Sequence, residues 1–511
     1  MSKFKLIQSA GMVGGLTLLS RVLGMGRDIV SAGLFGTTRI WDAFVFAFTI
    51  PNLLRRLVFE GAVSSAFIPI FVEISKTHGR EEARKFAGQV MTSLLLLLFI
   101  LAFLFYGLLG ISNSFGFFSE KWKMAFNFLA ILFPYVFLLL AVAVSMGVLN
   151  SEKHFFTPAM SQIILNLAWI IGVLFVAPII SRDPLVQIRI LCFIIVLSGF
   201  VQLAIQWFPL HRRRFAFKLV WNFASPWFSR FLSVLLPAAI GFSVFNLNIL
   251  MDYIFGYFLP EGASSSLWYA SRLMQFPMGL FAVSLGTVLL PEYSHHATAD
   301  EKSKINETIS FSLRSVGLII IPATVGLIVL AHPIVRVLFE RGEFTELSTL
   351  RTRNVLIAYT LGLPFYSALP SLAAAFYGIQ DMKTPLKAGI TALISHLLLN
   401  FILWPLAGES GFALSTAIAG IINFCMLAFL FRREIGSFEG RRFVFFIIKI
   451  FGVSLFMGWI TGIIFGYFSF LNEYLQLSAA IAGGIGIYIF ICLLFRIHEM
   501  RRAFEWILLK K

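Results

Sequence analysis

The sequence has few charged residues for its length. Charged side chains make up 13% of its 511 residues, whereas soluble domains carry about 25%. Apolar stretches near the roughly 20 residues needed to span a bilayer recur along the whole chain, as in MTSLLLLLFILAFLFYGLLGI from Met91 to Ile111. This composition excludes a soluble protein and predicts an all-α polytopic membrane protein.

Cysteine and nucleotide-binding motifs are also scarce. Cys192, Cys425 and Cys492 lie in three different apolar runs without paired spacing, so neither a disulfide framework nor a cysteine metal site is predicted. The sequence lacks a Gly-rich loop of the Walker type, which argues against direct ATP hydrolysis. No catalytic arrangement emerges from the histidines and acids, so we predict no enzyme activity and no cofactor.

The excess of basic residues is distributed in short clusters. The formal charge is +16, but Lys and Arg gather at the ends of apolar segments instead of forming a basic domain. This pattern indicates loops that face anionic membrane lipids, not a nucleic-acid partner. Most Lys and Arg fall on the side that holds both termini, so we predict that both termini are cytoplasmic. The segment from Arg336 to Arg353 is the main exception, and an amphipathic segment lying on the membrane would explain it.

The apolar runs predict about fourteen transmembrane helices in three groups. The first six lie near 9–35, 40–73, 89–112, 124–149, 157–179 and 187–210. The next six lie near 231–258, 265–293, 307–331, 350–378, 384–406 and 410–431, and a last pair lies near 444–468 and 474–496. We therefore predict an N-terminal lobe (1–215), a C-terminal lobe (216–435) and an appended helix pair (436–511).

A weak internal repeat supports two pseudo-symmetric six-helix lobes. Trp, Pro, Gly and Pro follow in the same order in the second and the eighth helix, with drifting spacing. The segments starting at Phe133 and Leu363 each contain an apolar helix with proline, a polar turn and a Thr-Pro pair that opens the next helix. Internal repeats of this kind are typical of transporters.

Nine of the charged residues within the predicted spans are the candidates for a functional site. Each costs about 2.5 to 3.5 kcal/mol at the bilayer centre, so such groups face protein or a water-filled cavity. Arginines outnumber acids, and the planar guanidinium suits bidentate binding of phosphate or carboxylate. We therefore predict a cavity that binds an anion. The nine residues are Arg21, Arg27, Asp28, Asp42, Arg55, Arg56, Glu60, Asp252 and Arg272.

Local pairing accounts for some of these charges. Arg56 and Glu60 are four residues apart on one helical face, and Pro51 is expected to interrupt the helix just before Arg55. For Asp28 and Asp42 structural pairing is the expected role. Snorkelling to lipid headgroups is the alternative for the arginines near span ends.

Asp252 stands apart because its neighbours in NLNILMDYIFGYFL are apolar. It predicts a site for Na⁺ or H⁺, with Asn400 and Thr416 as further oxygen donors from later helices. The alternative is an acid at a helix end that meets water outside the membrane.

Four segments carry a resemblance to a known family. They are SRVLGMGRD (Ser20–Asp28), DAFVFAFTIPNLLRRLVFEGAVSSAFIPIF (Asp42–Phe71), SRLMQFPMGLFAVSLGTVLLPEYS (Ser271–Ser294) and FYGIQDMKTP (Phe376–Pro385). Together they resemble the MurJ (MviN) family of bacterial lipid II flippases, within the superfamily of multidrug, oligosaccharidyl-lipid and polysaccharide exporters. The resemblance covers essentially the full length.

The resemblance implies two lobes around a cationic cavity, with the last two helices forming a groove for an undecaprenyl tail. It implies transport of lipid II across the bacterial inner membrane by alternating access, driven by the membrane potential or by an ion gradient. The arginines would bind the diphosphate of lipid II. Positions matching the family's functional charges are Arg21, Arg27, Asp42, Arg55, Arg56 and Arg272, and Asn52 and Glu60 match its second-helix block.

The chain also departs from the family pattern. Ser271 and Gln275 flank Arg272 where relatives often carry acids, so an acidic partner for this arginine must come from elsewhere or be absent.

Other functions remain open at the level of the residues. A flippase for another polyprenyl-linked oligosaccharide needs the same cations, whereas a multidrug or cation antiporter needs acids and aromatic residues. A membrane-embedded transferase would need a catalytic acid or metal cluster in an outer loop.

Overall fold

The computed structural model describes most of the chain as helices. The described residues are 3–59, 62–116, 118–213, 215, 217–222, 225–298, 302–379, 381–436, 440–497 and 499–500. No strand occurs among them. The chain divides into two compact units, Met1–Ser265 and Ser266–Lys511.

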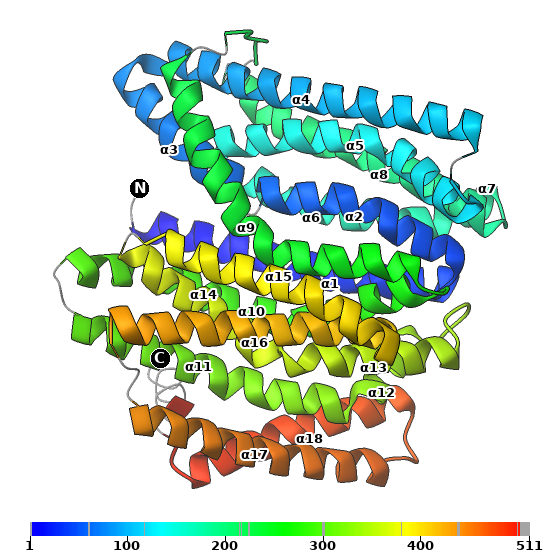
Figure 1. Ribbon diagram of the computed structural model, residues 1–511, viewed down its shortest axis with the longest axis vertical. Coiled ribbons are helices and arrows are strands. Elements are labelled where there is room, and N and C mark those ends of the chain that lie inside the picture. Colours follow the sequence, from blue (N-terminus) through cyan, green and yellow to red (C-terminus); the bar gives the residue numbers. More distant parts are fainter. Residues whose placement is uncertain are drawn as a thin grey trace. The chain divides into compact units, whose positions relative to one another are not determined.

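The N-terminal unit contains nine numbered α-helices and one π-helix. Within it, α4, α5 and α8 lie side by side, and α9 packs against α2 and α3 (Figure 1). The helices are α1 (Lys3–Phe35), α2 (Arg39–Phe59), α3 (Ala62–Thr77), α4 (Gly79–Phe115), α5 (Glu120–Ser151), α6 (Phe156–Ile171), the π-helix η1 (Gly172–Val176), α7 (Ala177–Ile180), α8 (Pro184–Arg212) and α9 (Pro226–Phe258).

Burial distinguishes the central helix of this unit from a peripheral one. In the most apolar stretch of α5, 67% of the residues are buried, against 17% in α4. Since both stretches are strongly hydrophobic, α5 forms the core between α2 and α8, whereas most of the apolar surface of α4 remains exposed. An exposed apolar helix of this length is expected where the solvent is lipid.

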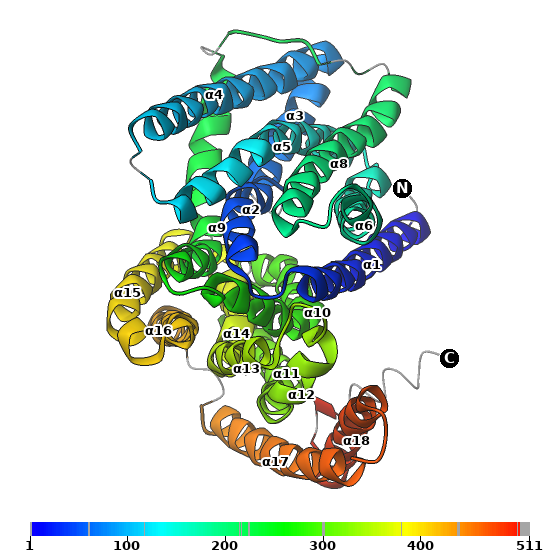
Figure 2. The ribbon, with the colours of Figure 1, turned by 90° about the vertical axis from the view of Figure 1, so that its right-hand side faces the viewer.

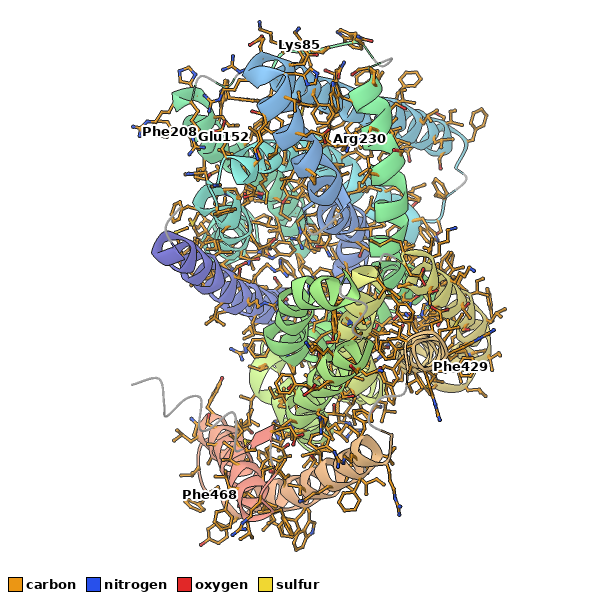
Figure 3. The ribbon with its side chains drawn as sticks, turned by 90° about the vertical axis from the view of Figure 1, so that its left-hand side faces the viewer. Lys85, Glu152, Phe208, Arg230, Phe429 and Phe468 are labelled. Atoms are coloured by element: carbon orange, nitrogen blue, oxygen red, sulfur yellow. The ribbon has the colours of Figure 1, made fainter. Side chains whose placement is uncertain are left out.

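Charged residues gather at one end of the N-terminal unit. Figure 3 faces this end and labels Lys85, Glu152 and Arg230. Glu152 accepts hydrogen bonds from Arg80 at 3.2 Å and from Arg213 at 2.7 Å. Because ion pairs of this kind are compatible with water and costly in lipid, this end lies outside the hydrocarbon layer.

The C-terminal unit begins within α10 (Ala263–Thr298). Its other helices are α11 (Lys302–Val329), α12 (Ala331–Phe339), α13 (Glu346–Leu361), α14 (Leu363–Gly378), α15 (Lys383–Ala407), α16 (Glu409–Glu434), α17 (Gly440–Tyr467) and α18 (Glu473–Leu494). The helices α17 and α18 form a pair (Figure 2) that packs on α11. The contact is apolar, and Tyr488 donates a hydrogen bond to the carbonyl of Leu318 at 2.6 Å.

The predicted helices agree in position with the described ones, with some differences. The expected span 40–73 appears as α2 and α3 on either side of residues 60–61, which lie outside the described part. The expected span 350–378 is bent by 40° between α13 and α14. The predicted interruption at Pro51 is wrong, because α2 continues through this residue. A proline in a membrane helix is tolerated where neighbouring groups satisfy the freed carbonyl.

By length and composition, nine of the described helices could cross a membrane, or ten if α13 and α14 form one span. The total of fourteen spans therefore stays a prediction. So do the lobe boundaries near 215 and 435, because they rest on a repeat in the sequence.

Candidate functional site: buried arginines and their amide partners

Arg27 on α1 is paired with the neighbouring acid. The Arg27 side chain is 6% exposed and donates to Oδ1 of Asp28 from Nη2 at 2.8 Å and from Nε at 3.1 Å. Its Nη1 donates to Oδ1 of Asn166 at 3.3 Å, and its guanidinium carbon lies 4.5 Å from the centroid of the Trp169 ring. A buried ion pair needs such additional partners to offset the cost of desolvation. Arg27 thus links α1 to α6, and it is joined to Asp28 as the sequence predicted for that acid.

Arg55 on α2 donates two hydrogen bonds to neutral amide groups. Its Nη1 donates to Oε1 of Gln162 at 2.6 Å, and its Nη2 donates to Oδ1 of Asn52 at 3.0 Å. The Arg55 side chain is half-buried, and Asn52 is buried one turn earlier on the same helix. Amide oxygens accept hydrogen bonds without carrying a negative charge, so these two bonds orient the guanidinium without cancelling its charge. A fixed guanidinium is suited to bind phosphate oxygens.

The remaining predicted residues of the second helix are described only in part. Arg56 lies on α2, but its side chain is outside the described residues, and so is Glu60. Their predicted pairing therefore stays a prediction. Arg21 is half-buried on α1.

Arg272 belongs to the C-terminal unit. Its guanidinium carbon lies 4.2 Å from the centroid of the Trp268 ring, one turn earlier on α10. Ser271 is buried and donates from its hydroxyl to the carbonyl of Trp268 at 2.9 Å, while Gln275 is half-buried. At this distance the indole ring attracts the guanidinium through a cation–π interaction.

Asp42 on α2 accepts hydrogen bonds from the backbone at the start of α10. Its Oδ2 accepts from the backbone N–H of Gly262 at 2.6 Å, and its Oδ1 accepts from the backbone N–H of Ser265 at 2.8 Å and from the Ser265 hydroxyl at 2.5 Å. These donors include N–H groups that a helix leaves unsatisfied in its first turn. Asp42 is 1% exposed, so its carboxylate fastens α2 to the chain that enters α10. The expectation of structural pairing identified the kind of role, but the partners are backbone groups and a serine.

The predicted cation ligands fall into both units. Asp252 on α9 is fully buried in the N-terminal unit. In the C-terminal unit, Asn400 Nδ2 lies 3.3 Å and Thr416 Oγ1 3.0 Å from Nε2 of the buried His396. The Thr416 contact joins α16 to α15, whereas Asn400 and His396 both lie on α15. Across the described residues, no group of three or more His, Cys, Asp and Glu could hold a metal ion, and the Na⁺ or H⁺ site stays a prediction.

The residues on α6 that contact Arg27 and Arg55 were not identified from the sequence. Gln162 and Asn166 carry no charge, so a search for charges within spans passes over them. One signal was available, because two amides four residues apart in the apolar run FTPAMSQIILNLAWII lie on one face of a helix. Trp169 extends the same face by about one more turn.

Comparison with known proteins places these residues in a family. The model of the lipid II flippase MurJ family matches residues 31–482. The probable lipid II flippase MurJ of Vibrio cholerae is 33% identical, covering 83% of this chain and 82% of that protein. The lipid II flippase MurJ of Burkholderia cenocepacia is 31% identical, covering 87% of each chain.

Solved structures agree with this assignment. The structure described as "Lipid II flippase MurJ, inward closed conformation" superposes with a TM-score of 0.78 at 30% identity, covering 95% of this chain and 98% of that one. An inward-facing multidrug transporter of the MATE family has a TM-score of 0.66 at 15% identity and covers 83% of this chain and 96% of its own, which shows a shared fold alone. The chain therefore belongs to the MurJ family of lipid II flippases.

Proposed function

We propose that this chain moves lipid II, the undecaprenyl-diphosphate-linked peptidoglycan precursor, from the cytoplasmic to the outer leaflet of the bacterial inner membrane by alternating access. Membership of the family supports this substrate. The protein is accordingly a multi-pass transporter of peptidoglycan biosynthesis and not an enzyme. The observation that carries the chemistry is Arg55, whose guanidinium is fixed by two neutral amides.

The diphosphate is the part of lipid II that is most costly to move through hydrocarbon, because charged groups lose their hydration there. A guanidinium that keeps its charge can replace part of that hydration with bidentate hydrogen bonds. We assign the main contact to the diphosphate to Arg55. We keep four further cations as proposed contacts to the headgroup, namely Arg21, Arg27, Arg56 and Arg272. The proposed supporting residues are Asp28, Asp42, Asn52, Glu60, Ser271 and Gln275.

The proposed arrangement in the membrane has about fourteen spans, two six-helix lobes and both termini in the cytoplasm. The pair α17 and α18 would provide the groove for the undecaprenyl tail. Large apolar side chains that α17 exposes support this role, among them Phe445, Ile448 and Trp459. Apolar groups exposed on a membrane helix meet acyl or polyprenyl chains without loss of hydration.

Coupling to Na⁺ or H⁺ is part of the proposal. Asp252 supports it because a fully buried carboxyl is stable when it binds a cation or a proton or has a polar partner. Asn400 and Thr416 would contribute neutral oxygens. The test is whether a Na⁺ gradient or a pH gradient, each imposed alone, changes the rate of lipid II transport in proteoliposomes.

The direct test of the function is transport of labelled lipid II in proteoliposomes with Arg55→Ala. Hydrogen bonds to charged groups contribute about 1.5 to 3 kcal/mol, so we expect the apparent KM to rise by about ten-fold or more. Arg182→Ala is the matched control, because Arg182 is an exposed arginine in the connection between α7 and α8.

Two further arms test the substrate. An O-antigen-type polyprenyl diphosphate lipid and an organic cation are offered to the same vesicles. Transport of either of them in place of lipid II would refute the proposed substrate, and equal transport by Arg55→Ala and Arg182→Ala would refute the role of Arg55.

A further inference from the structure

The helix α6 presents three residues to the buried arginines. Gln162 and Asn166 accept hydrogen bonds from Arg55 and Arg27, respectively, and the Trp169 ring lies against the Arg27 guanidinium. These residues are spaced by four and then three positions, so they form one stripe along the helix. One helix therefore contacts arginines from both α1 and α2.

The two amides that hold Arg55 come from different elements. Asn52 is on the arginine's own helix, so its bond moves with α2, whereas Gln162 fixes the guanidinium relative to α6. Each terminal nitrogen of a guanidinium carries two hydrogens, and each of these bonds uses one. These two bonds thus fix the plane of the group without themselves neutralising its charge.

The acceptor at position 162 has the chemistry that anion binding requires. A carboxylate there would form an ion pair with Arg55 and compete with the phosphate oxygens of a ligand. An apolar side chain would leave the flexible arginine without its anchor on α6. Glutamine combines an acceptor oxygen with zero charge.

We propose that Gln162 is a positioning residue for the transport reaction: it holds Arg55 in the orientation that binds the diphosphate. Asn166 on the same helix accepts a hydrogen bond from Arg27, but the Asp28 carboxylate also holds that arginine, so the proposal is confined to Gln162 and Arg55. This inference rests on the proposed function, because it names how that site orients its cation.

The experiment compares Gln162→Met, Gln162→Glu and the double variant Gln162→Met/Arg55→Ala in the lipid II transport assay. The matched control is Gln206→Met, because Gln206 is buried in α8 and donates to the Ser161 hydroxyl on α6 at 2.8 Å. Thermal unfolding in detergent shows that each variant is folded. Binding of undecaprenyl diphosphate to the purified protein gives a readout that is independent of transport.

We expect Gln162→Met to raise the apparent KM and the Kd for undecaprenyl diphosphate by about ten-fold, with kcat within two-fold of the wild type. Gln162→Glu should weaken binding more than Gln162→Met does, although it keeps an acceptor oxygen at the same place. In the Arg55→Ala background, Gln162→Met should add no further loss, because residues that act through one contact are not additive.

Three results would overturn the inference: a Gln162→Met variant that binds like Gln206→Met, losses that add in the double variant, or a Gln162→Glu variant that binds like the wild type. The last result would show that an acceptor of any charge suffices and that the role is structural. Failure of the wild type to move lipid II, or normal transport by Arg55→Ala, would instead refute the proposed function.

Discussion

The connection between α8 and α9 lies across α4 at a glycine, which makes Gly88→Ala a sharp test of the fold. A Cβ atom at Gly88 would lie 2.2 Å from the carbonyl oxygen of Lys218 and 3.1 Å from the Val220 side chain. The same backbone is fastened to α4 at two points. Gln89 Nε2 donates to the carbonyl of Asn222 at 2.8 Å, and the Val220 N–H donates to the hydroxyl of Thr92 at 3.1 Å.

The size of the effect follows from these contacts. The carbonyl of Lys218 must move by about 1 Å to reach an ordinary contact distance, and overpacking of this kind costs about 1 to 3 kcal/mol. Loss of the two hydrogen bonds would cost about 0.5 to 1.5 kcal/mol each. Alanine in place of glycine returns at most about 1 kcal/mol of helix propensity. Taking the middle of each range, we therefore expect Gly88→Ala to lower the free energy of unfolding by about 3 kcal/mol.

A second glycine on the same helix provides the control. A Cβ atom at Gly107 meets nothing within 4 Å, so Gly107→Ala should leave stability unchanged or raise it slightly. The assays are thermal unfolding in detergent and the rate of tryptic cleavage after Lys218, which should rise about ten-fold when the connection leaves α4. If Gly88→Ala matches Gly107→Ala in both assays, the connection is not held against α4 at this point.

Two further predictions concern aspartates that cap helices. Asp42→Ala leaves the buried N–H groups of Gly262 and Ser265 without their acceptor and should lower the free energy of unfolding by about 3 kcal/mol. The control is Asp183→Ala, which removes an exposed helix cap from the N–H of Leu185 at the start of α8 and should lower the free energy of unfolding by about 1 kcal/mol. If Asp42→Ala and Asp183→Ala lower stability equally in thermal unfolding, the assigned role of Asp42 is refuted. The second prediction concerns Asp381, which accepts hydrogen bonds from two N–H groups at the start of α15 at 2.9 and 3.0 Å. Partial burial acts to raise the pKa of its carboxyl, but the hydrogen bonds from this turn outweigh burial and lower the pKa. A carboxyl whose pKa is lowered on folding contributes stability above about pH 4, and this stability is lost as the pH falls through the pKa of the folded state. Asp381→Ala should therefore lower the free energy of unfolding by about 1 kcal/mol at pH 7 and by progressively less below pH 4. A difference in unfolding free energy that does not depend on pH would contradict this.

The fold was predictable because hydrophobic length is a direct signal in a membrane protein. An apolar run long enough to span the bilayer forms a helix regardless of its tertiary contacts, and most of the predicted helices lie where the structure has helices. Local breaks were less predictable. At the bend, a Cβ atom on Gly362 would lie 2.8 Å from the backbone of Ala417, so this position accommodates only glycine, and such a contact is not visible in the local sequence.

The candidate site was predictable in its cations and not in their partners. Arg27 and Arg55 were identified because a charge in an apolar run is costly and therefore conspicuous. Gln162 and Asn166 are more than 100 residues away in the chain, and neutral amides in an apolar helix give only a weak signal. The sequence thus indicates where charge is placed, whereas three-dimensional contacts determine how it is oriented.

The difference between the two arginines follows from their partners. Arg27 forms its ion pair with the next residue in the chain, and the two side chains are 6% and 2% exposed. Removing Arg27 alone would leave Asp28 as a buried acid without this partner, which is strongly destabilising. Loss of transport in an Arg27→Ala variant would therefore report folding as much as binding. Arg55 has neutral acceptors and a half-buried side chain, so replacing it leaves no carboxylate in these two bonds. Arg55→Ala is therefore combined with thermal unfolding, so that a change in lipid binding by a folded variant can be attributed to a lost contact with the diphosphate.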